Sequence, residues 1–389
     1  MACYIASTNN RFYAALESTF GMARPWTAAD RCSGLRLKAR QTAVIPQRKD
    51  KTGTRTYRGF ESRPRRNTDF EFLSYVNGAG APGSAPEHSA FFEAALGRTP
   101  LVYQGGVISA AADRSLTLGT GAALVVGQAI AYQDEIRFVT SLLDGGQVLL
   151  NAPFSGTLAA GGGIGGTVTY LPSGELKSLT LGDYWDPAGA VQRLLVGAAV
   201  DELSMEMNGS FHQFACKGPA KDLIDSITFE AGMAGVTEFP VEPVVEPGAG
   251  APIPGHIGQI WIGPEPSRLY TISDLVLRVK NNILMRSNEF GSYVPQCFSA
   301  GRREVTVQFS LYERDDEISK MIYQASRTRT PLSLMIQLGD TSGQLCSIWL
   351  QGFVPQVPQF DDGDGQLSWK FDSSQAQGGT DDEISIAFA

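Results

Sequence analysis

The sequence predicts a mainly β fold: two tandem β-sandwich domains, each with a flanking α-helix, plus a small β-barrel inserted into the first domain. Three observations predict it. First, the 389 residues include 43 glycines and 21 prolines, which separate many short runs rich in Val, Ile, Thr, Phe and Tyr. Second, one β-rich unit occurs twice. Third, a stretch of short alternating segments interrupts the first copy.

The repeated unit becomes visible when residues 62–75 are aligned with residues 299–312. Each window follows an alternating strand, at 35–39 or 275–279, and precedes a short amphipathic helix. A duplication of this kind, in a chain without catalytic groups, favours an assembly subunit that presents two equivalent surfaces. Besides a shared serine, the identical pairs are Arg65 and Arg302, Arg66 and Arg303, Phe72 and Phe309, and Tyr75 and Tyr312.

The first domain is predicted to begin with a helix over residues 7–21, because its apolar residues recur at helical spacing before a glycine. Strands are predicted over 34–45 and 67–76. The polar stretch 46–66 between them is too long for a tight turn, so we expect it to project as a hairpin or arm. A second helix is predicted over 88–96.

From residue 101 to residue 171 the pattern changes to short alternating strands separated by glycine turns. The second copy has no counterpart to this stretch, which therefore predicts an inserted β-barrel. We expect it to be a compact appendage on the outside of any assembly, so its shortening should be tolerated. The expected barrel strands are 115–118, 129–132, 135–139 and 147–150, and the first domain is expected to resume at 194–207 and 210–216.

Residues 239–258 contain five prolines and neither helical nor strand periodicity, which predicts an extended linker. In the second copy, a helix over 315–325 places its apolar residues on one face, so that face should pack on a sheet. The predicted organisation is a first domain over 1–100 and 172–238, an inserted barrel over 101–171, a Pro-rich linker over 239–258 and a second domain over 259–389.

The net charge of −8 is unevenly distributed. Residues 36–66 carry +9, which leaves −17 on the rest of the chain. This basic arm is compatible with nucleic-acid binding, but the acidic remainder would repel DNA, so we favour contact with an acidic surface of another subunit. The residues expected to make inter-ring or inter-subunit contacts are Arg48, Lys49, Lys51, Arg55, Arg58, Arg63, Arg65 and Arg66.

No group of residues predicts catalysis, a cofactor or a metal, so we expect a protein that is not an enzyme. Residues 161–166 satisfy GxGxxG, but a strand is expected after them where nucleotide binding needs a helix. The three histidines are scattered, and the five cysteines lack paired spacings, which favours reduced thiols. Residues 361–365 resemble a calcium loop but lack the required acids in register, which favours a solvated turn.

No apolar run reaches membrane-spanning length, and the N-terminal residues lack the core of a signal peptide. With 43% apolar and 19% charged residues, the chain has the composition of a globular protein. We therefore expect a soluble protein made in the cytosol, with no membrane partner.

Several segments resemble the tail tube proteins of long, non-contractile-tailed bacteriophages. Residues 17–21 (Glu-Ser-Thr-Phe-Gly) are similar to the N-terminal signature of that family. The pair Asn281–Asn282 after a strand, with 301–306 entering the next strand, is similar as well. So are residues 360–365 followed by 381–386. The resemblance covers most of the chain.

The resemblance implies a structural virion protein whose β-sandwich and helix form rings that stack into the hollow tail tube through which DNA is delivered. Typical members have one such domain per chain and six chains per ring, so two fused copies imply trimeric rings with pseudo-sixfold symmetry. The implied partners are other copies of the chain and the tape measure, tail terminator and baseplate proteins. Double-stranded DNA would pass without specific binding, for which an acidic or neutral lumen is suited.

The implied location is the virion tail, after synthesis in the host cytoplasm. Two alternatives remain at this point. One is a baseplate or receptor-binding tail component built from similar sandwiches. The other is a nucleic-acid-binding protein that uses the basic arm 36–66.

Overall fold

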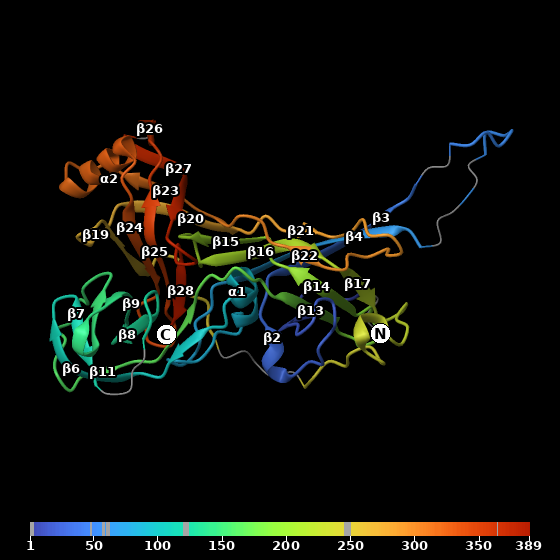
Figure 1. Cartoon of the computed structure of the whole chain (residues 1–389), viewed down its shortest axis with the longest axis horizontal. Helices are drawn as coiled ribbons and strands as arrows, with labels where there is room; N and C mark the ends of the chain where they lie inside the picture. The colour runs from blue at the N-terminus through green and yellow to red at the C-terminus, as the bar shows by residue number, and fades with distance from the viewer. Residues whose placement is uncertain are drawn as a thin grey trace.

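The computed structural model describes residues 4–46, 49–56, 59, 63–119, 124–244, 250–363 and 365–389. Its described part is mainly β, with many strands, two α-helices and several sheets, as the sequence predicts. One long sheet connects the two copies of the repeated unit, and the inserted barrel lies beside the second copy (Figure 1).

The first copy is built from two sheets. One has the strand order β17-β14-β13-β1-β2, and the other has the order β15-β16-β4-β3. The strands of the first sheet are β1 (Asn10–Leu16), β2 (Arg31–Cys32), β13 (Ser178–Trp185), β14 (Arg193–Ala199) and β17 (Asp222–Asp225). Those of the second sheet are β3 (Arg36–Val44), β4 (Arg65–Tyr75), β15 (Glu202–Met207) and β16 (Gln213–Ala220).

The second copy repeats both sheets strand for strand, as β28-β25-β24-β18-β19 and β26-β27-β23-β20. In addition, β25 pairs with β27, which joins the two sheets of this copy along one side. The strands are β18 (Gly258–Ile262), β19 (Ser267–Leu269), β20 (Ile272–Lys280), β23 (Glu304–Tyr312), β24 (Leu332–Leu338), β25 (Cys346–Val354), β26 (Gln359–Asp361), β27 (Ser368–Gln377) and β28 (Ser385–Phe388).

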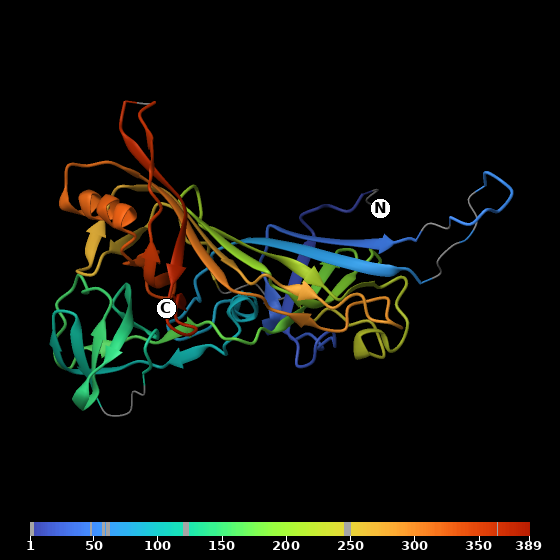
Figure 2. The ribbon, with the colours of Figure 1, turned by 45° about the horizontal axis from the view of Figure 1, so that its top comes forward.

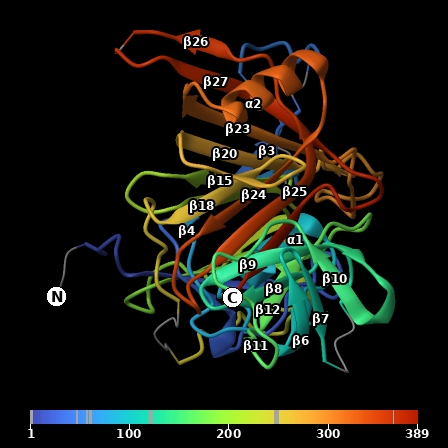
Figure 3. The same ribbon diagram turned by 90° about the vertical axis from the view of Figure 1, so that its left-hand side faces the viewer.

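The copies are joined because β15, at the edge of the first copy, pairs antiparallel with β20, at the edge of the second. The result is one continuous eight-strand series, β3-β4-β16-β15-β20-β23-β27-β26. Figure 3 shows β26, β27, β23, β20 and β15 one above another, with β26 at the top. The identical topology of the two copies is the structural counterpart of the sequence repeat.

The predicted N-terminal helix over 7–21 is wrong, because this segment contains strand β1. Phe12 and Ala14 contact one hydrophobic cluster, whereas Tyr13 and Ala15 contact another, so the buried residues alternate between two faces. A short, continuously apolar run does not distinguish a buried strand from a buried helix by periodicity. Antiparallel pairing with β13 along the whole length of β1 decides for the strand.

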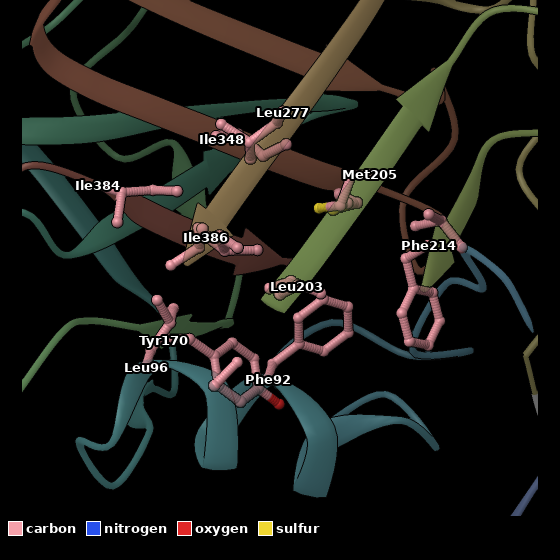
Figure 4. Packing of buried hydrophobic residues seen from close by; sticks show 14 of the residues in the cluster. Phe92, Leu96, Tyr170, Leu203, Met205, Phe214, Leu277, Ile348, Ile384 and Ile386 are labelled. Carbon is pink, nitrogen blue, oxygen red and sulfur yellow. The ribbon is translucent and has the colours of Figure 1, made fainter. Parts of the chain in front are cut away.

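Helix α1 follows β4, and helix α2 follows β23, the counterpart of β4 in the second copy. Helix α1 (Ser89–Leu96) is buried on nearly every side, and Figure 4 shows its Phe92 and Leu96 against Tyr170 and the strands of both copies. Helix α2 (Glu317–Thr328) buries one face through Ile322 and Ala325 and exposes the other, as the amphipathic pattern predicts.

The inserted barrel is smaller than the predicted 101–171. Its order is β11-β6-β7-β10-β9-β8, and a bridge between Ala131 and Gly165 nearly closes it. Its strands are β6 (Gly106–Ala112), β7 (Ser115–Leu118), β8 (Ala129–Tyr132), β9 (Glu135–Leu142), β10 (Gln147–Leu150) and β11 (Gly163–Ile164). The flanking β5 (Leu101–Tyr103) and β12 (Thr167–Tyr170) instead extend the second copy, because β12 pairs with β28.

The barrel also packs against the second copy. The rings of Phe138 and Trp349 stack with their centroids 5.9 Å apart, and the Ile136 N–H donates to Gln337 Oε1 at 2.9 Å. This contact argues against the expected tolerance of barrel deletion, since removal would uncover Trp349 and the neighbouring Met335.

The described part of the linker 239–258 contains no helix, and its first strand is β18, which begins at Gly258. Both ends of the linker contact the rest of the protein. The Arg11 guanidinium donates two hydrogen bonds to Glu242, at 2.5 and 2.7 Å. Further on, Ile253 is fully buried, with its backbone bonded to Val76 and His212. Two short strands, β21 (Leu284–Met285) and β22 (Phe298–Ser299), pair with each other in the loop between β20 and β23.

Candidate assembly interface

The eight-strand series ends in two edges that have no strand partner in the described part of the chain. Strand β3 pairs with β4 alone, and β26 pairs with β27 alone. An unpaired edge presents a row of backbone N–H and C=O groups that can accept another strand. The edges lie at opposite ends of the molecule, one near the base of the projecting arm and one in the β26–β27 hairpin (Figure 2).

Each free edge corresponds to an edge that is used inside the chain. Strand β3 holds the place in the first copy that β20 holds in the second, and β26 holds the place of β15. Strands β15 and β20 pair over six residues. The two free edges are therefore equivalent to the two edges that meet in this pairing, but they have no partner in the described part of the chain. A second chain can therefore extend the sheet by repeating a junction that the fold already contains.

The charges on these edges follow the same polarity. Within the chain, β15 carries Glu202 and Glu206, and it faces β20, which carries Arg278 and Lys280. The free edge equivalent to β15 is also acidic, with exposed Asp361 at the end of β26 and exposed Asp362 beside it. The free edge equivalent to β20 is basic, and its exposed charged side chains are Arg36, Lys38 and Arg40.

Across the polar face of the sheet, neighbouring strands place opposite charges directly beside one another. Two of these pairs are ionic contacts, Lys38 with Glu71 at 3.6 Å and Lys217 with Glu202 at 2.8 Å. Opposite charges in facing positions stabilise strand pairing, whereas like charges oppose it. The row in register from β3 to β23 is Lys38, Glu71, Lys217, Glu202, Lys280 and Glu304.

Glu71 shows the electrostatic effect of this row. Burial works to raise the pKa of its carboxyl group, but the hydrogen bond from Arg36, at 2.6 Å, and the charges of Arg36 and Lys38 outweigh burial. The pKa of Glu71 is therefore held below its ordinary value, and the carboxylate stays ionised at neutral pH. Along this row the signs alternate, so adjacent strands do not present like charges side by side.

An exposed aromatic side chain marks the acidic edge. Phe360 in β26 is 59% exposed, although its ring lies 5.6 Å from that of Trp369 and 6.1 Å from that of Tyr323. The indole N–H of Trp369 is buried and has no hydrogen-bond partner among the described residues. This end of the sheet therefore has an exposed apolar ring, that of Phe360, beside an indole N–H without a hydrogen-bond partner among the described residues.

The basic arm between β3 and β4 projects away from the body of the protein (Figure 1). Of the residues predicted to make contacts there, Lys49, Lys51 and Arg55 lie on its described part. Arg48 and Arg58 lie outside the described residues.

Three other predicted residues, Arg63, Arg65 and Arg66, lie at the base of the arm. The Arg66 guanidinium is 3.2 Å from Asp222, and the backbone N–H of Arg66 donates to the Tyr293 carbonyl oxygen at 2.9 Å. Tyr293 belongs to the loop between β20 and β23, which is the second copy's counterpart of the arm. At the β15–β20 junction, this loop of the second copy therefore lies against the first copy.

The repeat-equivalent arginines occupy similar places. Arg65 and Arg66 begin β4, whereas Arg302 and Arg303 directly precede β23. Arg303 Nη1 contacts Glu383 at 2.8 Å and Asp381 at 3.1 Å. Arg66 and Arg303 thus each form an ion pair with an acidic residue near the last strand of their own copy.

The repeat-equivalent aromatic residues also lie in corresponding strands. Phe72 and Phe309 are both 1% exposed and face the core from β4 and β23. Tyr75 and Tyr312 end the same two strands. The sequence alignment of the copies therefore agrees with their strand order.

No group of three or more His, Cys, Asp or Glu side chains suited to a metal ion occurs among the described residues. The GxGxxG run enters β12, a strand, and so lacks the helix that nucleotide binding would need. The acidic turn 361–365 connects β26 to β27. Sequence reasoning found this turn but missed its place at a free edge, because edge position depends on the pairing of distant strands.

No helix in the described ranges is long and apolar enough to cross a membrane. No family model matches the chain, and no curated protein matches it. The candidate site is therefore defined by geometry and charge: two complementary sheet edges at opposite ends of one molecule.

Proposed function

We propose that this protein is a structural subunit that polymerises into stacked rings, forming the hollow tail tube through which a bacteriophage delivers its DNA. The observation that carries the proposal is the β15–β20 junction. It joins two copies of one fold edge to edge and leaves an equivalent pair of edges open at the two ends. Repetition of the same junction between chains adds two copies per chain.

A ring is the natural product of such a repetition, because a head-to-tail contact generates a closed ring when its rotation completes a full turn. Closure also removes both free edges of the eight-strand series. Three chains would supply six copies and give the ring pseudo-sixfold symmetry. In this proposal the tape measure, tail terminator and baseplate proteins are the other partners, and the virion tail is the location.

The polar face of the sheet suits a lumen. Its opposite charges lie side by side, as in the contact of Lys217 with Glu202. Binding to duplex DNA draws its affinity mainly from neutralised phosphates, and a face whose cations are already paired offers few free ones. DNA would therefore pass along such a face without being retained.

The test is negative-stain microscopy of the purified protein, combined with sedimentation over a range of concentrations. We expect rings or tubes with a central channel and a mass that is a multiple of three chains. A protein that stays monomeric at every concentration would rule out the proposal. A single closed collar that never stacks would favour a baseplate component, and salt-sensitive binding of DNA by the monomer would favour a nucleic-acid-binding protein.

A further inference from the structure

We infer that β26 of one chain pairs antiparallel with β3 of the next, in the register that places Asp361 opposite Lys38. The inference rests on the proposed function and adds the residues that meet. It comes from the repeat itself, because the chain contains one example of the junction, the pairing of β15 with β20. The partner is a second copy of this chain.

The register follows from corresponding rows of paired residues. In the first copy, Tyr75 at the end of β4 faces Gln213, which faces Glu206. In the second copy, Tyr312 at the end of β23 faces Ser368, which faces Asp361. Asp361 therefore holds the place of Glu206 at the edge.

The residue opposite is found in the same way. Glu206 faces Val276 in β20, and Val276 faces Gln308, four positions before Tyr312. Four positions before Tyr75 lies Glu71, which faces Lys38 in β3. Lys38 therefore holds the place of Val276, and it is the residue that Asp361 meets on the next chain.

Continuing along the strands, Phe360 takes the place of Met205 and meets Ala39, and Gln359 takes the place of Ser204 and meets Arg40. The faces agree with this register. Ala39 is half-buried and Lys38 is exposed in β3, while Phe360 lies with Trp369 and Asp361 is exposed. Apolar residues would meet on one face and opposite charges on the other.

Disulfide trapping tests the register. One protein carries Phe360→Cys and the other Ala39→Cys, both with Cys3 and Cys297 changed to Ser, and the two are mixed and oxidised after assembly. Directly opposed residues of antiparallel strands are about 4.5–5.5 Å apart at Cα, within the range of a disulfide. We expect a strong band of crosslinked dimer from this mixture.

Ala43→Cys in place of Ala39→Cys is the matched control, since it lies on the same face of β3 about 13 Å further along. We expect at least tenfold less crosslinking from it. Equal yields, or assembled particles without the Phe360–Ala39 crosslink, would overturn the register while leaving the proposed function standing. A wild-type protein that never assembles would overturn both.

Charge exchange provides a second readout that does not depend on Phe360. Asp361→Lys and Lys38→Glu should each reduce assembly at least tenfold in the concentration required, and the double variant should recover most of the loss. A monomer with unchanged circular dichroism and melting temperature shows that each variant folds. Failure of the double variant to recover, with both single variants folded, would contradict the pairing of these two residues.

Discussion

At the scale of single residues, the first copy depends on a buried carboxylate without a cationic partner among its hydrogen bonds. Glu17 is 9% exposed and accepts hydrogen bonds from the N–H groups of Gly21, at 2.7 Å, and Gly197, at 2.8 Å. The hydroxyls of Ser178 and Thr180 donate to it as well, at 2.6 and 2.8 Å. Burial raises the pKa of Glu17, although these four bonds act in the opposite direction. One side chain thus ties the turn after β1 to β13 and β14.

We expect Glu17→Gln to lower the free energy of unfolding by about 1–3 kcal/mol, because one of the two oxygens that accept becomes an NH2 donor that faces other donors. Chemical denaturation measures the loss, with the exposed Glu175→Gln as the control, which should change stability by less than about 0.5 kcal/mol. The raised folded-state pKa also predicts a pH effect. As the pH falls through that pKa, the folded state binds the proton first, so wild type gains stability relative to Glu17→Gln. A difference that stays constant with pH would contradict the raised pKa.

At the scale of elements, the inserted barrel is packed on the second copy through β8 and β9. Besides the Phe138–Trp349 stack, Arg137 is fully buried and lies 3.1 Å from Glu135. Burial lowers the pKa of Arg137 to about 10, while Glu135 acts to raise it, so both groups remain ionised at neutral pH. This ion pair lies within β9, and Arg137 reaches the second copy through its guanidinium carbon, which is 5.4 Å from the centroid of the Trp261 ring. The barrel is therefore attached by stacked rings and this cation–π contact as well as by its two connecting strands.

We expect Phe138→Ala to destabilise the protein by about 3–5 kcal/mol, because it leaves a cavity beside Trp349. Val107→Ala, on an exposed side of the same barrel, is the matched control and should cost under about 1 kcal/mol. Thermal unfolding followed by tryptophan fluorescence reports on both, since Trp349 lies at the contact. If Phe138→Ala melts like wild type, the barrel does not depend on this contact.

At the scale of the whole molecule, the chain has an acidic body, a basic arm and two complementary edges. The arm reaches beyond the body, where no described part of the same chain covers it (Figure 2). Surface ion pairs contribute only about 0.2–1 kcal/mol each, but a contact repeated around every ring adds many of them. In the proposed assembly, we therefore expect the arm to make contacts between rings or neighbouring subunits, and the edges to close each ring.

Changing Arg48, Lys49, Lys51 and Arg55 together to Glu should leave the monomer folded and abolish stacking of rings. Wild-type stacking should weaken as ionic strength rises, because salt screens exposed charges. Sedimentation of both proteins across a salt series measures the effect. In the control variant, the two arginines become lysines and the two lysines become arginines, so the charge of the arm is unchanged. Tubes of normal length from the quadruple Glu variant would refute the role of the arm.

The sequence by itself determined the mainly β class, the repeat, the arm and both helices. Strands β3 and β4 follow from alternating residues, and α2 follows from an apolar face at helical spacing, because these patterns depend on near neighbours in the chain. Segment β1 was the exception. Its apolar residues suit a buried helix as well as a strand, and only pairing with β13, far along the chain, decides between them.

Only the tertiary structure decided which strands became neighbours and which became edges. The row from Lys38 to Glu304 draws on six strands from three separate parts of the chain, 36–75, 202–220 and 272–312, so no local pattern reveals it. The same holds for Asp361, which the sequence places in a turn and the fold places at an open edge. Local periodicity sets the type of an element, whereas the burial of one element against another sets its partner, and the candidate interface depends on partners.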